Sequence, residues 1–178
     1  RDIWTVELAG GKETQLTNHP TADDDPVYSP DGRWIAFDSA RDGGQAIFVM
    51  PAEGGPARRV TQGSGFFQAP SWSPDGSMLA FEAFEPESAA SGGLFVVSAA
   101  GGPAMQISRD GQAACWTRGG EWIYFHATRG GEQGIWRVPA PRGVQLGERV
   151  PFLGRIEVDR RKEMAGLFEE AWKRLKDG

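Results

Sequence analysis

Two short clusters of side chains are the features of the sequence most suited to binding chemistry. Asp23, Asp24 and Asp25 place three consecutive carboxylates just before a predicted strand. Such a cluster would attract a peptide amino terminus or a basic side chain, although the sequence favours a solvated loop end. Phe66 and Phe67 are adjacent aromatics beside glycines, and they either contact a ligand at a channel rim or pack beneath their loop. These five residues are our candidates for a substrate channel.

The sequence offers no catalytic set. A Ser-His-Asp triad needs a histidine that a carboxylate orients beside the serine, whereas His19 and His126 occupy positions that accept any polar residue. Neither a Gly-x-Ser-x-Gly elbow nor a Ser-x-x-Lys motif is present. The single cysteine, Cys115, aligns with inner-strand residues, so we expect a buried, unreactive thiol. No His/Cys spacing fits zinc. We therefore expect no catalytic residue, no metal site and no cofactor.

Composition restricts the partners. The formal net charge of −5 argues against nucleic acid, because phosphate binding uses clustered Lys and Arg. The longest apolar runs fall short of the ~18 residues that a membrane span requires, so we expect none. Seven Trp and ten Phe indicate a folded chain rather than a disordered one. The expected partners are a peptide substrate or a protein, with a homo-oligomer of the parent protein as a further option. Cytoplasmic and periplasmic locations both remain open.

An internal repeat determines which elements position these residues. Segment 26–37 recurs at 70–81 and, with changes, at 114–125, so that Ser29, Ser73 and Thr117 are 44 residues apart. An Ile-aromatic-Val type of segment also recurs, in most copies before a Gly-Gly pair. A period near 44 with short strands is typical of four-stranded propeller blades. A β-sandwich with coincidental spacing is the competing interpretation.

The turn residues give the order of the strands. Ser-Pro-Asp-Gly favours a type I turn between the first two strands of a blade, and Gly-Gly supplies positive φ for a later hairpin. We expect two final strands in 3–17, whole blades in 26–61 and 70–108, and three strands in 115–138. The pattern leaves open whether 144–150 completes the last blade. The predicted fold class is therefore all-β, with an incomplete β-propeller in residues 1–149.

The tail has a different pattern. Residues 150–159 are extended, and 160–176 carry apolar residues at i, i+3, i+4, i+7 and i+8, as an amphipathic helix does. Asp159 is suited to cap that helix. We therefore expect a linker strand and one C-terminal α-helix in residues 150–178, belonging to a different domain.

The repeat resembles the TolB-type propeller repeat over residues 2–139, and the third copy departs from it at Arg118-Gly119. The tail, with Ile-Glu-Val-Asp, Arg-Arg-x-Glu and Phe-x-Glu-Ala-Trp, looks like the junction where tricorn-type serine proteases leave the second propeller for the protease core. This resemblance implies a non-catalytic propeller segment that channels or filters peptides towards a downstream serine active site. The alternatives are a TolB-like interaction propeller without enzymatic activity, or a propeller attached to another hydrolase.

Overall fold

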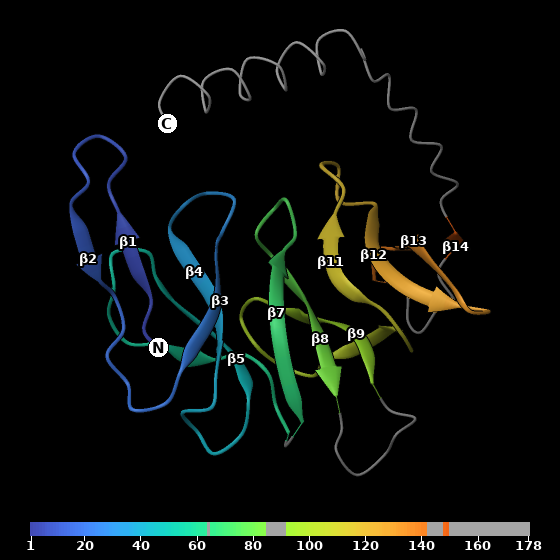
Figure 1. Cartoon of the computed structure of the whole chain (residues 1–178), viewed down its shortest axis with the longest axis horizontal. Coiled ribbons are helices and arrows are strands. Elements are labelled where there is room, and N and C mark those ends of the chain that lie inside the picture. The colour runs from blue at the N-terminus through green and yellow to red at the C-terminus, as the bar shows by residue number, and fades with distance from the viewer. Residues whose placement is uncertain (64, 85–91, 142–147, 150–178) are drawn as a thin grey trace, which may run out of the picture.

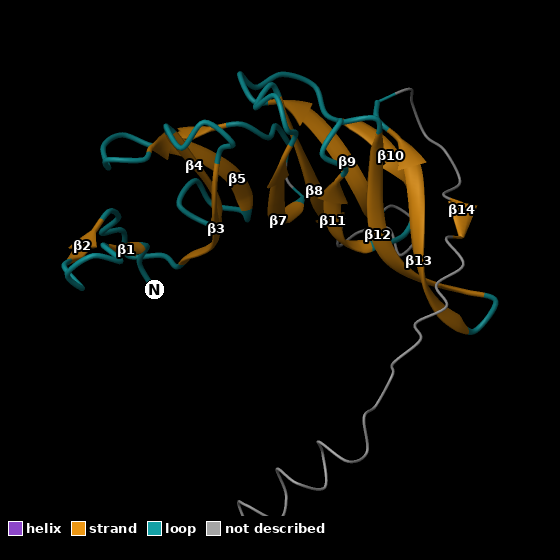
Figure 2. Cartoon of the chain, turned by 90° about the horizontal axis from the view of Figure 1, so that it is seen from above, coloured by secondary structure: helices purple, strands orange, loops and turns teal. Residues whose placement is uncertain are grey.

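The computed structural model describes residues 1–63, 65–84, 92–141 and 148–149. Within these ranges the regular structure is entirely β, arranged as one two-stranded and three four-stranded antiparallel sheets. The sheets follow one another along the chain and stand side by side along an arc (Figures 1 and 2). The expectation of an all-β chain built from four-stranded units is therefore confirmed for this part of the molecule.

Each four-stranded sheet is a meander of consecutive strands. Sheet 1 contains β1 (Trp4–Val6) and β2 (Glu13–Gln15). Sheet 2 contains β3 (Asp23–Tyr28), β4 (Trp34–Ser39), β5 (Ala46–Pro51) and β6 (Arg58–Arg59). Sheet 3 contains β7 (Phe66–Trp72), β8 (Met78–Phe84), β9 (Gly93–Ser98) and β10 (Met105–Ser108). Sheet 4 contains β11 (Gln112–Trp116), β12 (Trp122–Arg129), β13 (Glu132–Pro139) and β14 (Glu148–Arg149).

The fourth sheet is more complete than the sequence pattern required. β14, within the range 144–150 left open by the sequence, pairs with β13 in an antiparallel register and supplies the fourth strand, whereas the other residues of that range lie outside the described part of the chain. Residues 85–91, between β8 and β9, and the predicted C-terminal helix lie outside the described residues. Among the residues that are described, no helix is long and apolar enough to cross a membrane.

The first strand of each four-stranded sheet begins three or four residues earlier than expected, because it continues across a β-bulge. The register shifts between residues 24 and 27, 68 and 71, and 112 and 115. The residue inside each bulge has a positive φ, which is 50° at Asp25, 51° at Ala69 and 53° at Ala113. Bulges bend a strand and redirect its side chains. The three aspartates therefore lie on β3 itself rather than on the loop before it.

The turn between the first and second strands is built as its sequence predicts. In sheet 3, the Ser73 hydroxyl donates to the Asp75 carboxylate at 2.6 Å and accepts from the Met78 main-chain N–H at 2.9 Å. Sheet 2 repeats this pattern, with Ser29 donating to Asp31 at 2.6 Å. A side chain that forms hydrogen bonds within its own turn satisfies main-chain groups that the turn would otherwise leave unpaired.

The core lies between adjacent sheets. The three repeated phenylalanines, Phe37, Phe81 and Phe125, are at most 1% exposed, which confirms their predicted packing role. An additional polar contact joins the sheets, because the Trp116 indole Nε1–H donates to the carbonyl oxygen of Ser71 at 3.1 Å. A buried indole N–H needs such a partner, so the tryptophan both fills space and fixes the position of the next sheet.

Candidate functional site

The five candidate residues lie at the start of two neighbouring inner strands, β3 and β7, which contact each other. They therefore lie at the same end of these two strands, but their environments differ. Asp23 is 3% exposed, whereas Phe66 is 53% exposed. A solvated loop end, the interpretation that the sequence favoured, therefore does not describe Asp23.

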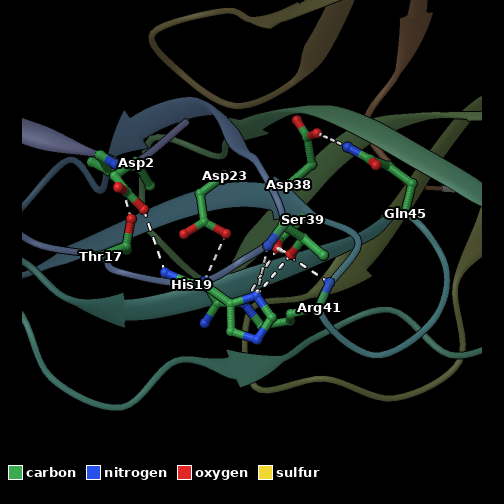
Figure 3. Close-up of polar contacts among 10 residues, drawn as sticks. Asp2, Thr17, His19, Asp23, Asp38, Ser39, Arg41 and Gln45 are labelled. Atoms are coloured by element: carbon green, nitrogen blue, oxygen red, sulfur yellow. Dashed lines mark hydrogen bonds and ion pairs between the residues drawn. The ribbon is translucent and has the colours of Figure 1, made fainter.

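Asp23 forms a buried ion pair. Arg41 Nη2 donates to Asp23 Oδ1 at 2.7 Å, with the two side chains 16% and 0% exposed (Figure 3). The guanidinium also lies 4.9 Å from the ring centroid of Phe37 and 5.0 Å from that of Phe48. Burial raises the pKa of Asp23, but hydrogen bonds, of which that of Arg41 is the strongest, lower it further, so the pKa lies below its ordinary value. This pair holds the entry to β3 in place.

A related but more exposed ion pair lies beside sheet 4, where the Asp110 side chain is 40% exposed. Arg129 Nε donates to Asp110 Oδ2 at 2.7 Å, and its guanidinium lies 4.2 Å from the ring centroid of Trp136. Arg129 is 88 residues after Arg41, which is two repeat lengths. Because two separate sheets use this arrangement, we interpret the Asp23–Arg41 pair as structural, and Asp23 as a supporting residue of the acidic cluster.

Asp24 and Asp25 form the exposed part of the cluster. Asp25 is exposed and lies inside the bulge, and the half-buried Asp24 pairs with Arg1 at 2.9 Å. Asp24 also faces Asp38 directly across β3 and β4. Burial, and then the charges of Asp25 and Asp24, raise the pKa of Asp38 to about 6, while the Gln45 amide opposes the shift. The cluster therefore concentrates negative charge at the end of β3.

Phe66 and Phe67 point in different directions, as neighbours on a strand do. Phe67 packs edge-on against Phe81, with ring centroids 5.7 Å apart and an interplanar angle of 86°. Phe66 leaves half of its surface open to solvent. Phe67 therefore packs beneath the strand, and contact of the exposed Phe66 with a ligand stays a prediction.

The histidines are not arranged as a catalytic triad. His19 Nδ1 lies 2.8 Å from the Thr21 hydroxyl, and the Asp2 carboxylate accepts from the main-chain N–H of His19 at 3.4 Å rather than from its ring (Figure 3). His126 is exposed on β12, where it faces Gln112. A triad carboxylate must instead orient the imidazole.

Cys115 corrects one expectation. Its side chain is exposed on β11, rather than buried as its alignment with inner-strand residues suggested. Among the described residues, β11 pairs with β12 and packs against β7, β8 and β9 of the preceding sheet, and no described sheet covers its other face. Within the described part of the chain, no group of three or more His, Cys, Asp or Glu side chains is placed to hold a metal ion.

Sequence reasoning missed two residues of the cluster. Asp38 could have been predicted as a member of the cluster, because Glu82 occupies the same position 44 residues later. A carboxylate that recurs at a strand end indicates a role in the blade or its site. Arg41 has only the weaker signal of Arg129 two repeats away. Its partner is 18 residues distant, and the pair forms only when β3 and the loop after β4 meet.

Comparison with known proteins shows which family has this architecture. A family model described as the tricorn protease N-terminal beta propeller domain matches residues 1–113. The tail motif instead pointed to the second propeller of that family, and it lies outside the described residues. Tricorn protease homolog 1 of Streptomyces coelicolor is 31% identical over 137 residues, which cover 76% of this chain and 13% of the relative.

Solved structures agree in fold. A putative TolB from Agrobacterium tumefaciens superposes with a TM-score of 0.70 at 23% identity, covering 84% of this chain and 55% of that one. The beta-propeller domain of the trilobed protease from Pyrococcus furiosus gives a TM-score of 0.54 at 15% identity, covering 77% and 43%. The four-stranded sheets are therefore propeller blades of the kind found in tricorn-like and TolB-like proteins. With the family model matching more than half of its residues, the chain belongs to the tricorn protease family, as a segment of a β-propeller.

Proposed function

We propose that this segment is a non-catalytic part of a tricorn-like serine peptidase that guides extended peptides along its inner strands towards an active site elsewhere in the protein. In this proposal residues 1–149 belong to the propeller, and residues 150–178 are the linker strand and first helix of the protease core. A narrow channel admits an unfolded peptide and excludes a folded protein, so the propeller would act as a size filter.

The observation that carries the proposal is the acidic cluster beside an exposed aromatic at one end of the inner strands. Asp24 and Asp25 present carboxylates, and the buried Asp38 lies behind them. A peptide amino terminus is an ammonium group, and clustered carboxylates attract it by their summed negative charge. Phe66, on the next inner strand, adds an apolar contact. Together they suit the leading end of a peptide.

The repeat supports a functional interpretation of the carboxylates of Asp24 and Asp25. The residues that match Asp24 and Asp25 in sheet 3 are Gln68 and Ala69, and sheet 3 forms the same bulge without them. The fold therefore does not require acidic side chains at these positions, which leaves ligand binding as a reason for their presence.

The test is a binding measurement on the longest natural form of the chain. The fluorescence anisotropy of an unfolded, dye-labelled peptide with a free amino terminus is titrated against the wild type and against Asp24→Asn/Asp25→Asn. We expect the double variant to bind the free peptide on the order of tenfold more weakly than the wild type does, equivalent to about 1.4 kcal/mol. A peptide with an acetylated amino terminus should bind the wild type and the double variant equally.

The matched control removes two exposed carboxylates away from the inner strands. Glu13 lies on the outer strand β2, and Glu53 lies in the loop after β5, so Glu13→Gln/Glu53→Gln makes the same change in net charge. Equal weakening by both double variants would show that only net charge matters and would refute the proposal.

A TolB-like interaction propeller is the second candidate, and the superposition on a putative TolB favours it. Such a protein would bind folded partners with no preference for a free amino terminus. In the same titration, acetylated and free peptides would then bind equally, and Asp24→Asn/Asp25→Asn would have no selective effect.

A further inference from the structure

The contact between sheets 2 and 3 has an equivalent between sheets 3 and 4, and the two differ in one carboxylate. We call them the Asp38 joint and the Glu82 joint, after residues 44 positions apart on the second strands β4 and β8. Each side chain is buried, at 2% exposure for Asp38 and 6% for Glu82. The two joints differ in the hydrogen bonds that these carboxylates accept.

At the Glu82 joint both carboxylate oxygens have partners. Glu82 Oε1 accepts from the main-chain N–H of Ala113, the bulge residue of the next sheet, at 2.8 Å. Oε2 accepts from Gln68 Nε2 at 3.3 Å, and Gln68 is the residue directly opposite on β7. A buried carboxylate that accepts two hydrogen bonds is compatible with its charged form.

At the Asp38 joint one oxygen has no partner. Oδ2 accepts from Gln45 Nε2, whereas Oδ1 has no hydrogen-bond partner among the described residues (Figure 3). The bulge residue of the next sheet here is Ala69, whose N–H acts on the carboxylate without forming a well-aligned bond to Oδ1. An aspartate is one methylene shorter than a glutamate, which accounts for the missing contact. A buried carboxylate oxygen without a hydrogen-bond partner disfavours the charged form of the group.

The residue opposite makes the difference larger. Where Gln68 donates to Glu82, the matching residue Asp24 places a second carboxylate across from Asp38. Like charges directly opposite on neighbouring strands destabilise a sheet, and Asp25 adds a further negative charge. Arg1 is bonded to Asp24 at 2.9 Å but is 81% exposed, so solvent weakens its compensation. The facing strand β7 brings no titratable side chain.

We propose that the Asp38 joint is a pH-sensitive contact between two propeller blades, firm when Asp38 carries a proton and weaker when Asp38 is ionised. The Glu82 joint, in which both carboxylate oxygens accept hydrogen bonds, is the reference joint for comparison. The proposal concerns the stability of the blades and does not depend on the proposed peptide channel.

The direction of the pH effect follows from the difference between the closed and the open joint. The pKa of Asp38 is about 6 in the folded chain and 3.8 in an unstructured one, so the closed joint binds the proton more tightly. Opening therefore becomes easier as the pH rises from about 4 to about 6, and levels off above that. Between pH 5 and pH 7.5 the opening constant is expected to rise about tenfold.

Hydrogen–deuterium exchange on the longest natural form of the chain measures this opening locally. Exchange is followed by mass spectrometry at several pH values between 5 and 7.5 and is corrected for intrinsic amide rates. In the wild type, we expect segments 34–39 and 66–72 to lose about tenfold in protection relative to segments 78–84 and 112–116, which belong to the Glu82 joint.

Two variants separate the proposed cause from general pH effects. Asp38→Asn removes the titrating group. Asp38→Glu supplies a side chain of the same length as that of Glu82, which reaches its bulge N–H. In both variants the pH dependence of amide protection should become similar at the two joints. Asp38→Glu keeps a carboxylate and provides the test should Asp38→Asn fail to fold. Equal pH responses at both joints in the wild type, or an undiminished response in a folded variant, would overturn the proposal.

Discussion

The indole Nε1–H of Trp72 donates a hydrogen bond of 3.1 Å to the main-chain carbonyl oxygen of Val27, which belongs to the preceding sheet. Trp116 and Ser71 repeat this contact at the same distance between the next two sheets. This bond connects the first strands of successive blades, beside the apolar core of each interface and in addition to contacts such as that of Glu82 with Ala113. Blade packing in this chain combines hydrophobic burial with a directional contact that fixes the position of each sheet on the next.

Trp72→Phe tests that contact. The substitution keeps an aromatic ring but leaves the Val27 carbonyl oxygen without its donor, so we expect a loss of about 2 kcal/mol in the free energy of unfolding. Chemical denaturation followed by tryptophan fluorescence or circular dichroism measures it. Trp4→Phe is the control, since Trp4 is 53% exposed and its replacement should change stability by less than ~0.5 kcal/mol. Similar losses in both variants would contradict this account.

Arg41→Met tests the buried ion pair. Removing the guanidinium leaves the fully buried Asp23 carboxylate unpaired, for which we expect a loss of about 3–5 kcal/mol. The exposed pair Arg33–Asp31, with side chains 79% and 44% exposed, supplies the control, and Arg33→Met should leave the free energy of unfolding nearly unchanged. A double-mutant cycle with Asp23→Asn measures the coupling, and a coupling near zero would contradict the assignment.

The same pair predicts an acid-side pH effect. Because the pKa of Asp23 is lowered in the folded chain, its contribution to stability is present above the unfolded value of 3.8 and is lost as the pH falls below it. Melting temperatures measured between pH 2 and pH 5 should fall less steeply towards acid in Arg41→Met than in the wild type. Parallel curves for the two proteins would refute the prediction.

Ser73→Ala tests the turn. The hydroxyl donates to Asp75, and this bond is the largest contribution that lowers the Asp75 pKa to about 2. Without it, we expect the pKa to move towards 3.8, together with a loss of about 1 kcal/mol in stability. Carboxyl-carbon NMR titration follows the pKa. Ser98→Ala, in a different turn, should leave Asp75 unchanged, and an unmoved pKa in Ser73→Ala would disprove the role of the hydroxyl.

Ala69→Gly tests the bulge. Ala69 has a φ of 51°, a left-handed conformation that costs an alanine roughly 1 kcal/mol and a glycine almost nothing. We expect the variant to unfold at a slightly higher denaturant concentration, by an amount equivalent to about 0.5 kcal/mol. Ala80→Gly, at a fully buried position on β8, should destabilise by about 1 kcal/mol or more. A loss of stability in both variants would contradict the interpretation of strain.

The repeated turns could be predicted from the sequence because local geometry dictates their residues. Ser29 and Ser73 stand where a hydroxyl must bond its own turn, and Gly32 and Gly76 have φ values of 71° and 70°. The bulges could not, since Asp25 and Ala69 adopt a positive φ without the glycine that would have signalled it.

The candidate site was only partly foreseen, for reasons of burial. The aspartates were visible as a cluster, but the sequence could not separate the buried Asp23 from the exposed Asp25, because the difference depends on Arg41 arriving from the loop after β4. Cys115 was expected to be buried from its alignment with Val27 and Ser71, whose sheets are each followed by another sheet, whereas no described sheet follows that of Cys115. In both cases the decisive contact, or its absence, involves parts of the fold that are distant in sequence.

The central claim, that peptides travel along the inner strands, is tested most directly by photo-crosslinking. A benzophenone amino acid replaces either Phe66, on the inner strand β7, or Trp34, which is 40% exposed at the start of β4. With the longest natural form of the chain and an unfolded peptide bearing a free amino terminus, we predict crosslinks from position 66 that an excess of unlabelled peptide competes away. Crosslinks of equal yield from both positions, or none from position 66, would contradict the claim.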